Sequence, residues 1–346
     1  MNKITQCVHM LNYDLYRYSM KIFISGVTGY VGRNVARHLA NSHEIVGLAR
    51  DKEKTKILKD THLTFVYGDL LSHTLRNELK DCDIVIHTAA DTDHKNLSKN
   101  QYKTNVDGTA QLLKAAKAAG VKRFIHISTD SVLLTGKPIK NLSEDTSYPK
   151  KSVGNYSHTK QLAEKIVLNS NCDTFTVIVL RPRFVWGRDD TTAMPQILKA
   201  IENQTFAWIG GGHYLSSTTH IANLCHAVEA SLYRGTPKEI YFISDGDDRP
   251  FRETISGLIE AHGLTVPNKN IPGFIPLVIA KLDSLRRCLV PKSSPLPVTF
   301  QEYATSAVEV TLDITKAKQD LSYRPIMTFQ AGLDELKTTK STKQLS

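Results

Sequence analysis

The chain has 346 residues, 41% of them hydrophobic and 23% charged, and its formal net charge is +10. This is the composition of an ordinary globular protein, and the length suits one large α/β domain or a domain with a smaller lobe. Basic residues are spread among acidic ones, and no zinc-ligand pattern or ribonucleoprotein signature appears, so we expect no nucleic acid partner.

The first segment, 1–19, lacks the apolar core of a signal peptide, and we expect it to be an N-terminal extension. No run of about 18 apolar residues follows it, so no membrane-spanning helix is predicted. The five cysteines are scattered without paired spacing, at Cys7, Cys82, Cys172, Cys225 and Cys288. An odd, unpaired set is typical of reduced thiols, which predicts a cytoplasmic protein.

Short segments rich in β-branched residues then alternate with helical patterns. The predicted strands are 21–25, 44–49, 63–67, 83–88, 123–128, 174–180 and 239–243. Most are continuously apolar, as expected for parallel strands covered on both faces. The alternation predicts the α/β class, with a Rossmann-type doubly wound parallel sheet over 20–185. It loosens afterwards, so we expect a smaller C-terminal substrate-binding lobe, interleaved with the sheet domain, over 186–335, and a polar tail over 336–346.

A glycine-rich turn, GVTGYVG, connects the first predicted strand to a helical pattern. Its glycines are Gly26, Gly29 and Gly32. Glycines at such a turn let the backbone approach a pyrophosphate, which then lies at the positive end of a helix. The alternative is a plain strand-to-helix turn. The position directly after the first strand favours a dinucleotide site.

The residues after the second predicted strand indicate which dinucleotide binds. Arg50 follows Ala49 where an acidic residue would hold the ribose hydroxyls of NAD. An arginine can pair with a 2′-phosphate, so NADP is preferred over NAD. Asp51 is the competing residue, because it would point toward the ribose if the strand ended two residues later.

The third and fourth predicted strands end in residues that suit the same ligand. Asp69 is placed to accept a hydrogen bond from the adenine amino group, while Leu70 packs on the ring. Ala89 and Ala90 are small residues where the cofactor must pass close to the backbone. Each is weak evidence alone, but their order along the chain supports a dinucleotide.

A tyrosine and a lysine four residues apart open a later helix. Tyr156 is the only one of 13 tyrosines with a lysine at that distance, Lys160. Ala163 and Val167 continue the same stripe and need the core side, so the phenol and the ammonium group are predicted to face inward. An inward lysine is costly unless it is paired, which favours chemistry over a solvated helix face.

The chemistry of this pair needs a third group. A phenol with a pKa near 10 is a poor acid or base at neutral pH until a nearby cation stabilises its phenolate, a role predicted for Lys160. Thr129, at the end of the fifth predicted strand, would hydrogen-bond the substrate oxygen. Tyr156 would then donate a proton to a carbonyl, or remove one from an alcohol in reverse.

Together, the motifs GVTGYVG, GDL, HTAA, ISTDSV, YSHTK and LRPRFVWG resemble the extended short-chain dehydrogenase/reductase family, which belongs to the NAD-dependent epimerase/dehydratase superfamily. The resemblance covers about residues 21–335. It implies a Rossmann-type fold, catalytic residues Thr129, Tyr156 and Lys160 supported by Asn105, and a homodimer formed through two helices of each subunit.

The resemblance also implies the ligand-contacting residues. The implied cofactor-binding residues are Gly26, Thr28, Gly29, Tyr30, Val31, Gly32, Arg50, Asp69, Leu70, Ala89, Ala90, Tyr156 and Lys160. The implied substrate-binding residues are Thr129, Asp130, Arg183 and Trp186.

Departures from the sugar-nucleotide enzymes favour the 3β-hydroxysteroid dehydrogenase-like branch. Ser131 replaces the glutamate of the dehydratases, and Ser216 and Ser217 occupy a segment where a nucleotide-holding arginine is common. We therefore expect an NAD(P)-dependent oxidoreductase that interconverts a secondary alcohol and a ketone on a hydrophobic substrate, steroid-like or long-chain 3-oxoacyl. The alternatives are a nucleotide-sugar epimerase or dehydratase with bound NAD and a non-catalytic NADP-sensing or scaffold protein.

The apolar stretch 271–285 agrees with a lipid-like substrate if it forms a pocket wall, but core packing of the lobe explains it equally well. The adjacent Arg286 and Arg287 suggest peripheral contact with an anionic membrane surface. The histidines, among them His87, His126, His158 and His220, lack the spacing of metal ligands, so no metal is expected.

Overall fold

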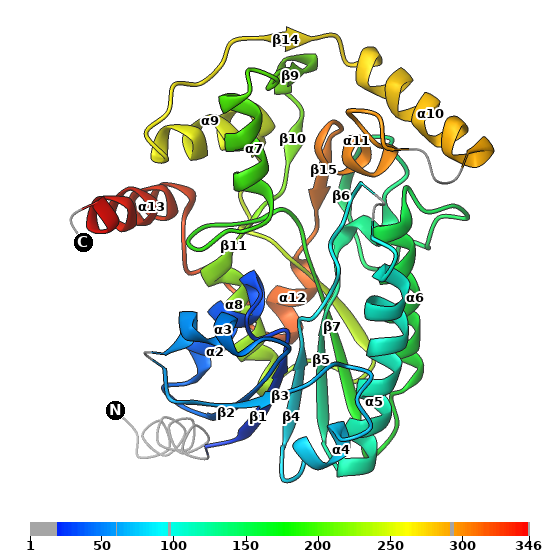
Figure 1. Cartoon of the computed structure of the whole chain (residues 1–346), viewed down its shortest axis with the longest axis vertical. Helices are drawn as coiled ribbons and strands as arrows, with labels where there is room; N and C mark the ends of the chain where they lie inside the picture. Colours follow the sequence, from blue (N-terminus) through cyan, green and yellow to red (C-terminus); the bar gives the residue numbers. More distant parts are fainter. Residues whose placement is uncertain (1–18, 60, 96–97, 291–293, 345–346) are drawn as a thin grey trace, which may run out of the picture.

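The computed structural model describes residues 19–344 except 60, 96–97 and 291–293, and the side chains of 339–344 are not described. The predicted extension, 1–19, therefore lies outside the described residues except for Ser19. A seven-stranded sheet forms the lower half of the molecule in Figure 1, and every neighbouring pair of its strands is parallel. In chain order the strands are β1 (Lys21–Ser25), β2 (Glu44–Ala49), β3 (Leu63–Tyr67), β4 (Ile84–His87), β5 (Arg123–Ile127), β7 (Thr176–Pro182) and β12 (Glu239–Ile243).

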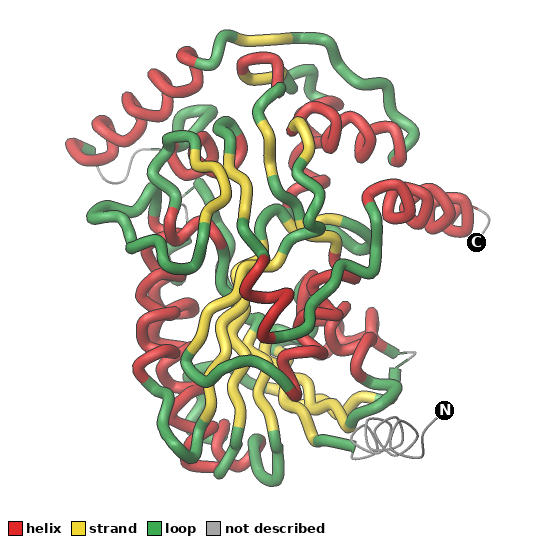
Figure 2. Tube along the Cα trace, turned by 180° about the vertical axis from the view of Figure 1, so that it is seen from behind, coloured by secondary structure: helices red, strands yellow, loops and turns green. Residues whose placement is uncertain are grey.

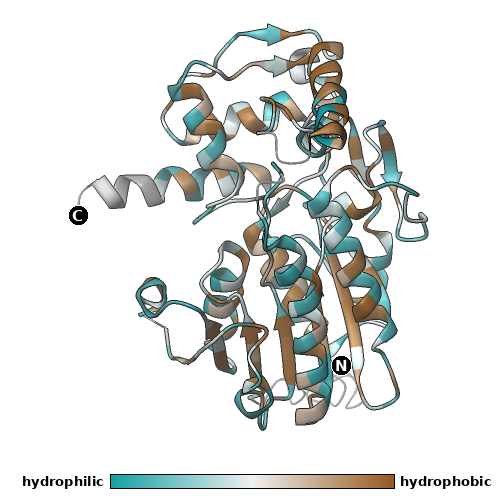
Figure 3. Ribbon diagram, turned by 45° about the vertical axis from the view of Figure 1, so that its right-hand side comes forward, coloured by the Kyte–Doolittle hydropathy of each residue, from teal (hydrophilic) through white to brown (hydrophobic). Residues whose placement is uncertain are grey.

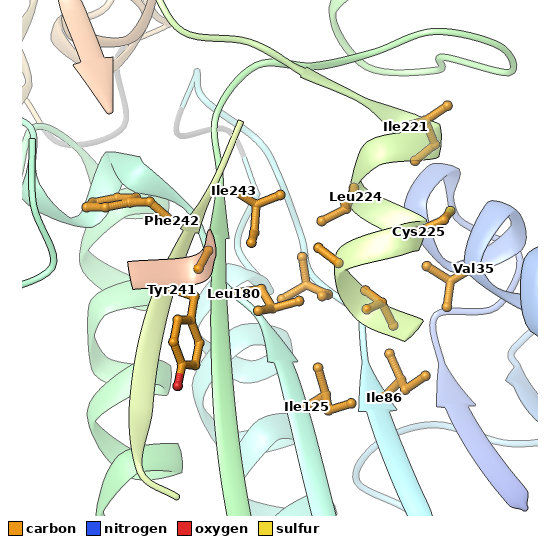
Figure 4. Packing of buried hydrophobic residues seen from close by; sticks show 14 of the residues in the cluster. Val35, Ile86, Ile125, Leu180, Ile221, Leu224, Cys225, Tyr241, Phe242 and Ile243 are labelled. Carbon is orange, nitrogen blue, oxygen red and sulfur yellow. The ribbon is translucent and has the colours of Figure 1, made fainter. Parts of the chain in front are cut away.

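Helices cover both faces of this sheet. Consecutive side chains of a strand point to opposite faces, and in β1 Ile22 and Ile24 join one buried cluster while Phe23 joins another. The first cluster includes residues of α2 (Tyr30–Leu39) and α8 (Ile221–Tyr233), and Figure 4 shows Val35 of α2 beside Cys225 of α8. The second includes residues of α5 (Gly108–Ala119) and α6 (Asn155–Asn169). Two-sided burial explains the continuously apolar strands, which are coloured as hydrophobic in Figure 3.

The order of the strands across the sheet is β12-β7-β5-β4-β1-β2-β3, so the predicted doubly wound parallel sheet is confirmed. The winding direction reverses between β1 and β4, and in such folds ligands bind at the carboxyl ends of the strands at this point. β1 and β4 end in register there, with Ser25 paired to His87. Short elements beside the sheet are α3 (Lys52–Thr55), α4 (Leu75–Glu78), η2 (Lys103–Asp107) and η3 (Asp130–Leu133).

A smaller lobe lies above the carboxyl ends of the strands (Figures 1 and 2). Its strands are β6 (Ile139–Leu142), β10 (Leu215–Ser216), β13 (Arg249–Pro250) and β15 (Val310–Leu312) in one sheet, with the pairs β8 (Val185–Trp186) with β11 (Thr219–His220) and β9 (Trp208–Ile209) with β14 (Asn270–Ile271). Its helices are α7 (Ala193–Glu202), α9 (Phe251–Ala261), α10 (Phe274–Leu289) and α11 (Phe300–Ser306). The chain returns from this lobe to supply α8 and β12, and it ends with α12 (Thr315–Asp320) and α13 (Phe329–Gln344).

No helix in the described part of the chain is long and apolar enough to cross a membrane.

Candidate active site

The glycine turn after β1 lies tightly against the end of β4. Gly26 has a φ of +74°, in the left-handed region that favours glycine, and a Cβ there would lie 2.7 Å from the Ala89 backbone. A Cβ on Gly32 would lie 2.2 Å from the Gly26 carbonyl oxygen. A Cβ added to Gly29, at the start of α2, would approach only the Gly26 carbonyl oxygen, at 3.2 Å. The outer side of the turn is therefore open at a helix N-terminus whose first turn has no acidic residue, which fits a pyrophosphate.

The other residues predicted in this turn differ in their exposure. Thr28 and Val31 are partly buried at the rim, where their backbone borders the open side. Tyr30 is buried in the main core cluster, and its hydroxyl has no hydrogen-bond partner among the described residues. Its side chain is thus part of the fold, and only its backbone is available to a ligand here. Ala89 and Ala90 are partly buried beside the turn, as expected for close passage of a cofactor.

The structure shows how Arg50 and Asp51 lie at the end of β2. The Asp51 carboxylate caps α3 by accepting a hydrogen bond from the Glu53 amide at 2.9 Å, so it is already engaged. Arg50 is exposed directly after the strand. Asp69 is also exposed and accepts from the Leu71 amide at 3.0 Å, while Leu70 is buried against α5. Packing of Leu70 on an adenine ring, as predicted, would need this side chain to turn outward.

The phenol and the ammonium group of α6 both face the sheet. Tyr156 is 8% exposed and Lys160 2%, and Ala163 and Val167 of the same stripe are fully buried, so the predicted helix orientation is the one observed. Thr129, after β5, lies close to Tyr156, because its side chain acts on the pKa of the phenol. The three residues that the sequence places far apart therefore meet at the carboxyl ends of the strands.

Lys160 has partners that the sequence did not predict. Its Nζ donates to the Ile127 carbonyl oxygen at 2.7 Å and lies 3.4 Å from His126 Nε2. Burial lowers the pKa of Lys160 to about 8, with the charge of Glu164 acting in the opposite direction. The ammonium group is therefore charged at neutral pH and is held against β5.

The pKa of Tyr156 is raised, not lowered. Burial is the largest cause, the charge of Asp130 adds to it, and the side chain of Thr129 acts against it. The expectation that Lys160 lowers this pKa is therefore wrong for this structure, because the ammonium group is bonded to β5. A phenol is protonated at neutral pH, as a proton donor must be, but a raised pKa makes it a weaker acid.

Asn105 connects the site to the loop after β4. Its amide oxygen accepts from the Asp91 amide at 2.7 Å, and its nitrogen donates to the Asp91 carbonyl and to the Thr159 hydroxyl, both at 3.0 Å. It lies in the π-helical turn η2, which directly precedes α5. Asn105 thus holds the loop beside α6 close to Tyr156, which agrees with the supporting position implied for it.

Two of the residues predicted to bind substrate pair with each other. Arg183 Nη1 lies 2.6 Å from Asp130 Oδ2, and both side chains are buried. Arg183 also donates to Ser216 Oγ at 3.3 Å and to the Thr305 carbonyl at 3.1 Å. These contacts join β7, η3, β10 and α11 at the floor of the lobe, so neither charge is open to a substrate in this state.

Trp186 is not brought to the site. It is fully buried in the core of the lobe, and its indole nitrogen donates to Asp245 Oδ2 at 2.9 Å. The structure therefore gives it a packing role where the resemblance implied substrate contact.

A histidine that the sequence analysis did not single out, His94, lies beside Tyr156. The rings of His94 and Tyr156 are 4.7 Å apart between centroids and tilted by 42°. Burial lowers the pKa of His94, so its ring is neutral at pH 7. No local pattern marks this residue, because it comes from the loop after β4 and reaches Tyr156 only through the fold.

Other buried polar groups lie at the ends of the strands. The hydroxyls of Ser128 and Ser131 are buried with no hydrogen-bond partner among the described residues, so a ligand at this edge could satisfy them. Together with the open glycine turn, they fit a bound dinucleotide. His87 is hydrogen-bonded to Ser25 at 2.6 Å and to Thr109 at 2.8 Å, and burial lowers its pKa to about 3.

In the described part of the chain, no three His, Cys, Asp or Glu residues form a metal site.

Comparisons with known proteins agree with this geometry. The model of the NAD dependent epimerase/dehydratase family matches residues 22–244. A 4-hydroxy-2-methyl-3-oxo-4-farnesyl-3,4-dihydroquinoline-1-oxide ketoreductase from Stigmatella aurantiaca is 36% identical over 92% of this chain and 96% of the relative. A 3-beta-hydroxysteroid dehydrogenase from Mycolicibacterium neoaurum is 26% identical over 91% and 90%. UDP-glucuronic acid 4-epimerase from Bacillus cereus, solved in complex with NAD, shares the fold with a TM-score of 0.71 and 22% identity over 92% of this chain and 99% of the epimerase.

Proposed function

Because the chain belongs to the NAD-dependent epimerase/dehydratase family, in its 3β-hydroxysteroid dehydrogenase-like branch, we propose that it reduces a ketone on a hydrophobic substrate to a secondary alcohol. The observation that carries this proposal is the buried Tyr156 phenol, which lies beside Thr129 and one helical turn from Lys160. The reverse oxidation uses the same groups. The farnesyl-bearing substrate named for the Stigmatella relative supports an apolar substrate here.

Each residue of the site has a separate role in carbonyl reduction. When bound, NADPH or NADH supplies the hydride. Tyr156, protonated at neutral pH, donates its proton to the carbonyl oxygen, and Thr129 holds that oxygen by a hydrogen bond. The proton lost by Tyr156 must be replaced before the next turnover. Lys160, whose ammonium group donates to the Ile127 carbonyl, holds α6 against β5. Asn105 keeps the loop after β4 in place.

The test of this function is cofactor consumption against a panel of ketones. Steroid ketones, 3-oxoacyl thioesters and UDP-sugars are offered with NADPH or NADH, and absorbance at the nicotinamide band is followed. We expect turnover of an apolar ketone and none of the UDP-sugars, because Ser216 and Ser217 stand where an arginine commonly holds the nucleotide. Epimerases and dehydratases return their bound NAD to its starting state, so conversion of the UDP-sugars is followed by chromatography of the products. Conversion of UDP-sugars alone would replace the proposal by the epimerase alternative.

We also propose that NADP is preferred over NAD. Arg50 is exposed at the end of β2, and the Asp51 carboxylate that would repel a 2′-phosphate is engaged in capping α3. A guanidinium group can hold a phosphate by two parallel hydrogen bonds. Arg50→Ala is expected to weaken NADPH binding about tenfold or more and NADH binding less than twofold, measured by titration of protein fluorescence.

The control for this prediction removes the same charge elsewhere. Lys199→Ala changes an exposed residue of α7, in the smaller lobe, and should leave both affinities unchanged. An equal loss of affinity for the two cofactors in Arg50→Ala would refute the phosphate assignment.

Two further proposals concern assembly and location. The family resemblance supports a homodimer formed through two helices of each subunit, and the cysteine pattern supports a cytoplasmic location.

A further inference from the structure

One helix of the smaller lobe exposes a continuous apolar face. Five large apolar side chains of α10 follow one another at steps of four, four, three and four residues, which places them on one side of the helix. They are Phe274, Val278, Leu282, Leu285 and Leu289, exposed by 66, 50, 53, 60 and 75%. Exposed apolar faces of this kind mark interaction sites. We call these five residues the α10 face.

The opposite side of α10 packs on the protein. Pro276, Ala280 and Asp283 are buried there, and Figure 1 shows α10 at the outer edge of the lobe next to α11. Asp283 is the only acidic residue of the helix, and it is paired with Arg287 at 2.9 Å. The expected pocket wall is therefore not formed by Phe274, whose ring points away from the core.

Basic residues border the α10 face on both sides. With about 100° of rotation per residue, Lys281 lies at one edge of the face and Arg286 at the other. Lys281 is exposed, and the side chain of Arg286 is 40% exposed. An apolar face between basic edges, without an exposed acid, is the pattern of helices that lie in the interface of anionic membranes.

We propose that the α10 face inserts into an anionic lipid surface, with α10 parallel to the membrane plane. The net charge of +10 favours the same partner, because the cytoplasmic leaflet is negative. A second copy of the chain is a poorer occupant. In a twofold antiparallel pairing of α10, the central Lys281 would lie next to Lys281 of the other copy, and like charges would meet.

The helix α10 reaches the loop beside Tyr156 through Arg287, on the side opposite the α10 face. Arg287 donates to the Lys95 carbonyl at 2.9 Å, and His94, the preceding residue, lies over Tyr156. Thr299, at the start of α11, donates to the His94 carbonyl at 3.1 Å. Membrane binding would thus bring the loop that covers Tyr156 near the lipid, where an apolar ketone is concentrated. This last consequence rests on the proposed function, whereas the binding itself does not.

Vesicle sedimentation tests the proposal. The full-length protein is mixed with vesicles of phosphatidylcholine alone or with phosphatidylserine added, and the bound fraction is measured. We expect binding to the anionic vesicles and at least about tenfold weaker binding in the double variant Leu282→Glu/Leu285→Glu. Both residues are exposed, so the fold should survive, which circular dichroism verifies. Ile57→Glu/Ile326→Glu is the matched control, since these residues are 45 and 57% exposed outside α10 and should bind as the wild type does.

Three results would overturn the proposal. The first is wild-type protein that does not bind anionic vesicles, and the second is a double variant that binds them as the wild type does. The third is light scattering that shows a dimer in the wild type and a monomer in the Leu282→Glu/Leu285→Glu variant without any vesicle binding, because the face would then join two copies. Reduction of a detergent-solubilised ketone should be the same in both proteins, so failure of membrane binding and failure of the proposed function are separate outcomes.

Discussion

Tyr156→Phe is expected to lower kcat for ketone reduction by about 10²–10⁴-fold, the usual contribution of a positioned acid or base. The variant loses only the phenolic hydroxyl, which lies near Thr129, and keeps the ring that packs beside His94. Folding and cofactor affinity should therefore stay close to those of the wild type. Steady-state kinetics with a ketone, together with NADPH titration, measure the two effects.

A second tyrosine serves as the control. Tyr102→Phe removes the hydroxyl of a residue that is 53% exposed, and it should leave kcat unchanged. If Tyr156→Phe retained wild-type turnover, another group would have to supply the proton and the role given to Tyr156 would be wrong. A loss of NADPH binding would point instead to a structural role for the hydroxyl.

Arg181→Met is expected to destabilise the protein by about 3–5 kcal/mol, because it leaves a buried carboxylate without its partner. Arg181 on β7 and Glu164 on α6 are 1 and 0% exposed, and Nε donates to the carboxylate at 3.0 Å. This ion pair holds α6, the helix that carries Tyr156 and Lys160, against the sheet. The midpoint of urea unfolding, followed by tryptophan fluorescence, should therefore fall markedly.

The matched control is an ion pair at the surface. Lys56 and Glu53 are joined at 2.5 Å, but their side chains are 71 and 73% exposed. Lys56→Met should change the free energy of unfolding by less than about 1 kcal/mol. Similar unfolding midpoints for Arg181→Met and the wild type would show that water or a rearranged neighbour satisfies Glu164, contrary to the expectation.

The strands, the glycine turn and the inward orientation of Tyr156 and Lys160 were predictable from the sequence. Each depends on residues close together in the chain. A continuous apolar run requires cover on both faces, and the spacing of four residues places the lysine and the tyrosine on one side of a helix. The fold class and the family follow from these local patterns, and both are confirmed.

Contacts between distant residues were decided by the tertiary structure. Asp130 and Arg183 are 53 positions apart and neutralise each other, so two charges expected to meet a substrate instead hold the lobe to the sheet. Lys160 is bonded to Ile127, 33 positions away, and burial of Tyr156 raises the pKa of its phenol. Residue types predict which groups can pair, but the partner that each one finds depends on distances that only folding sets.

The stretch 271–285 shows most clearly which properties the sequence determines and which the tertiary structure decides. By itself the sequence determined that this segment is apolar, and from that pattern a pocket wall and a packed core were equally good predictions. Only the tertiary structure decided that Phe274, Val278 and Leu282 face solvent, because Asp283 and Ala280 occupy the side that packs on the protein. Periodicity shows which residues share a face of a helix, whereas the neighbours that cover one face and leave the other open come from the rest of the chain.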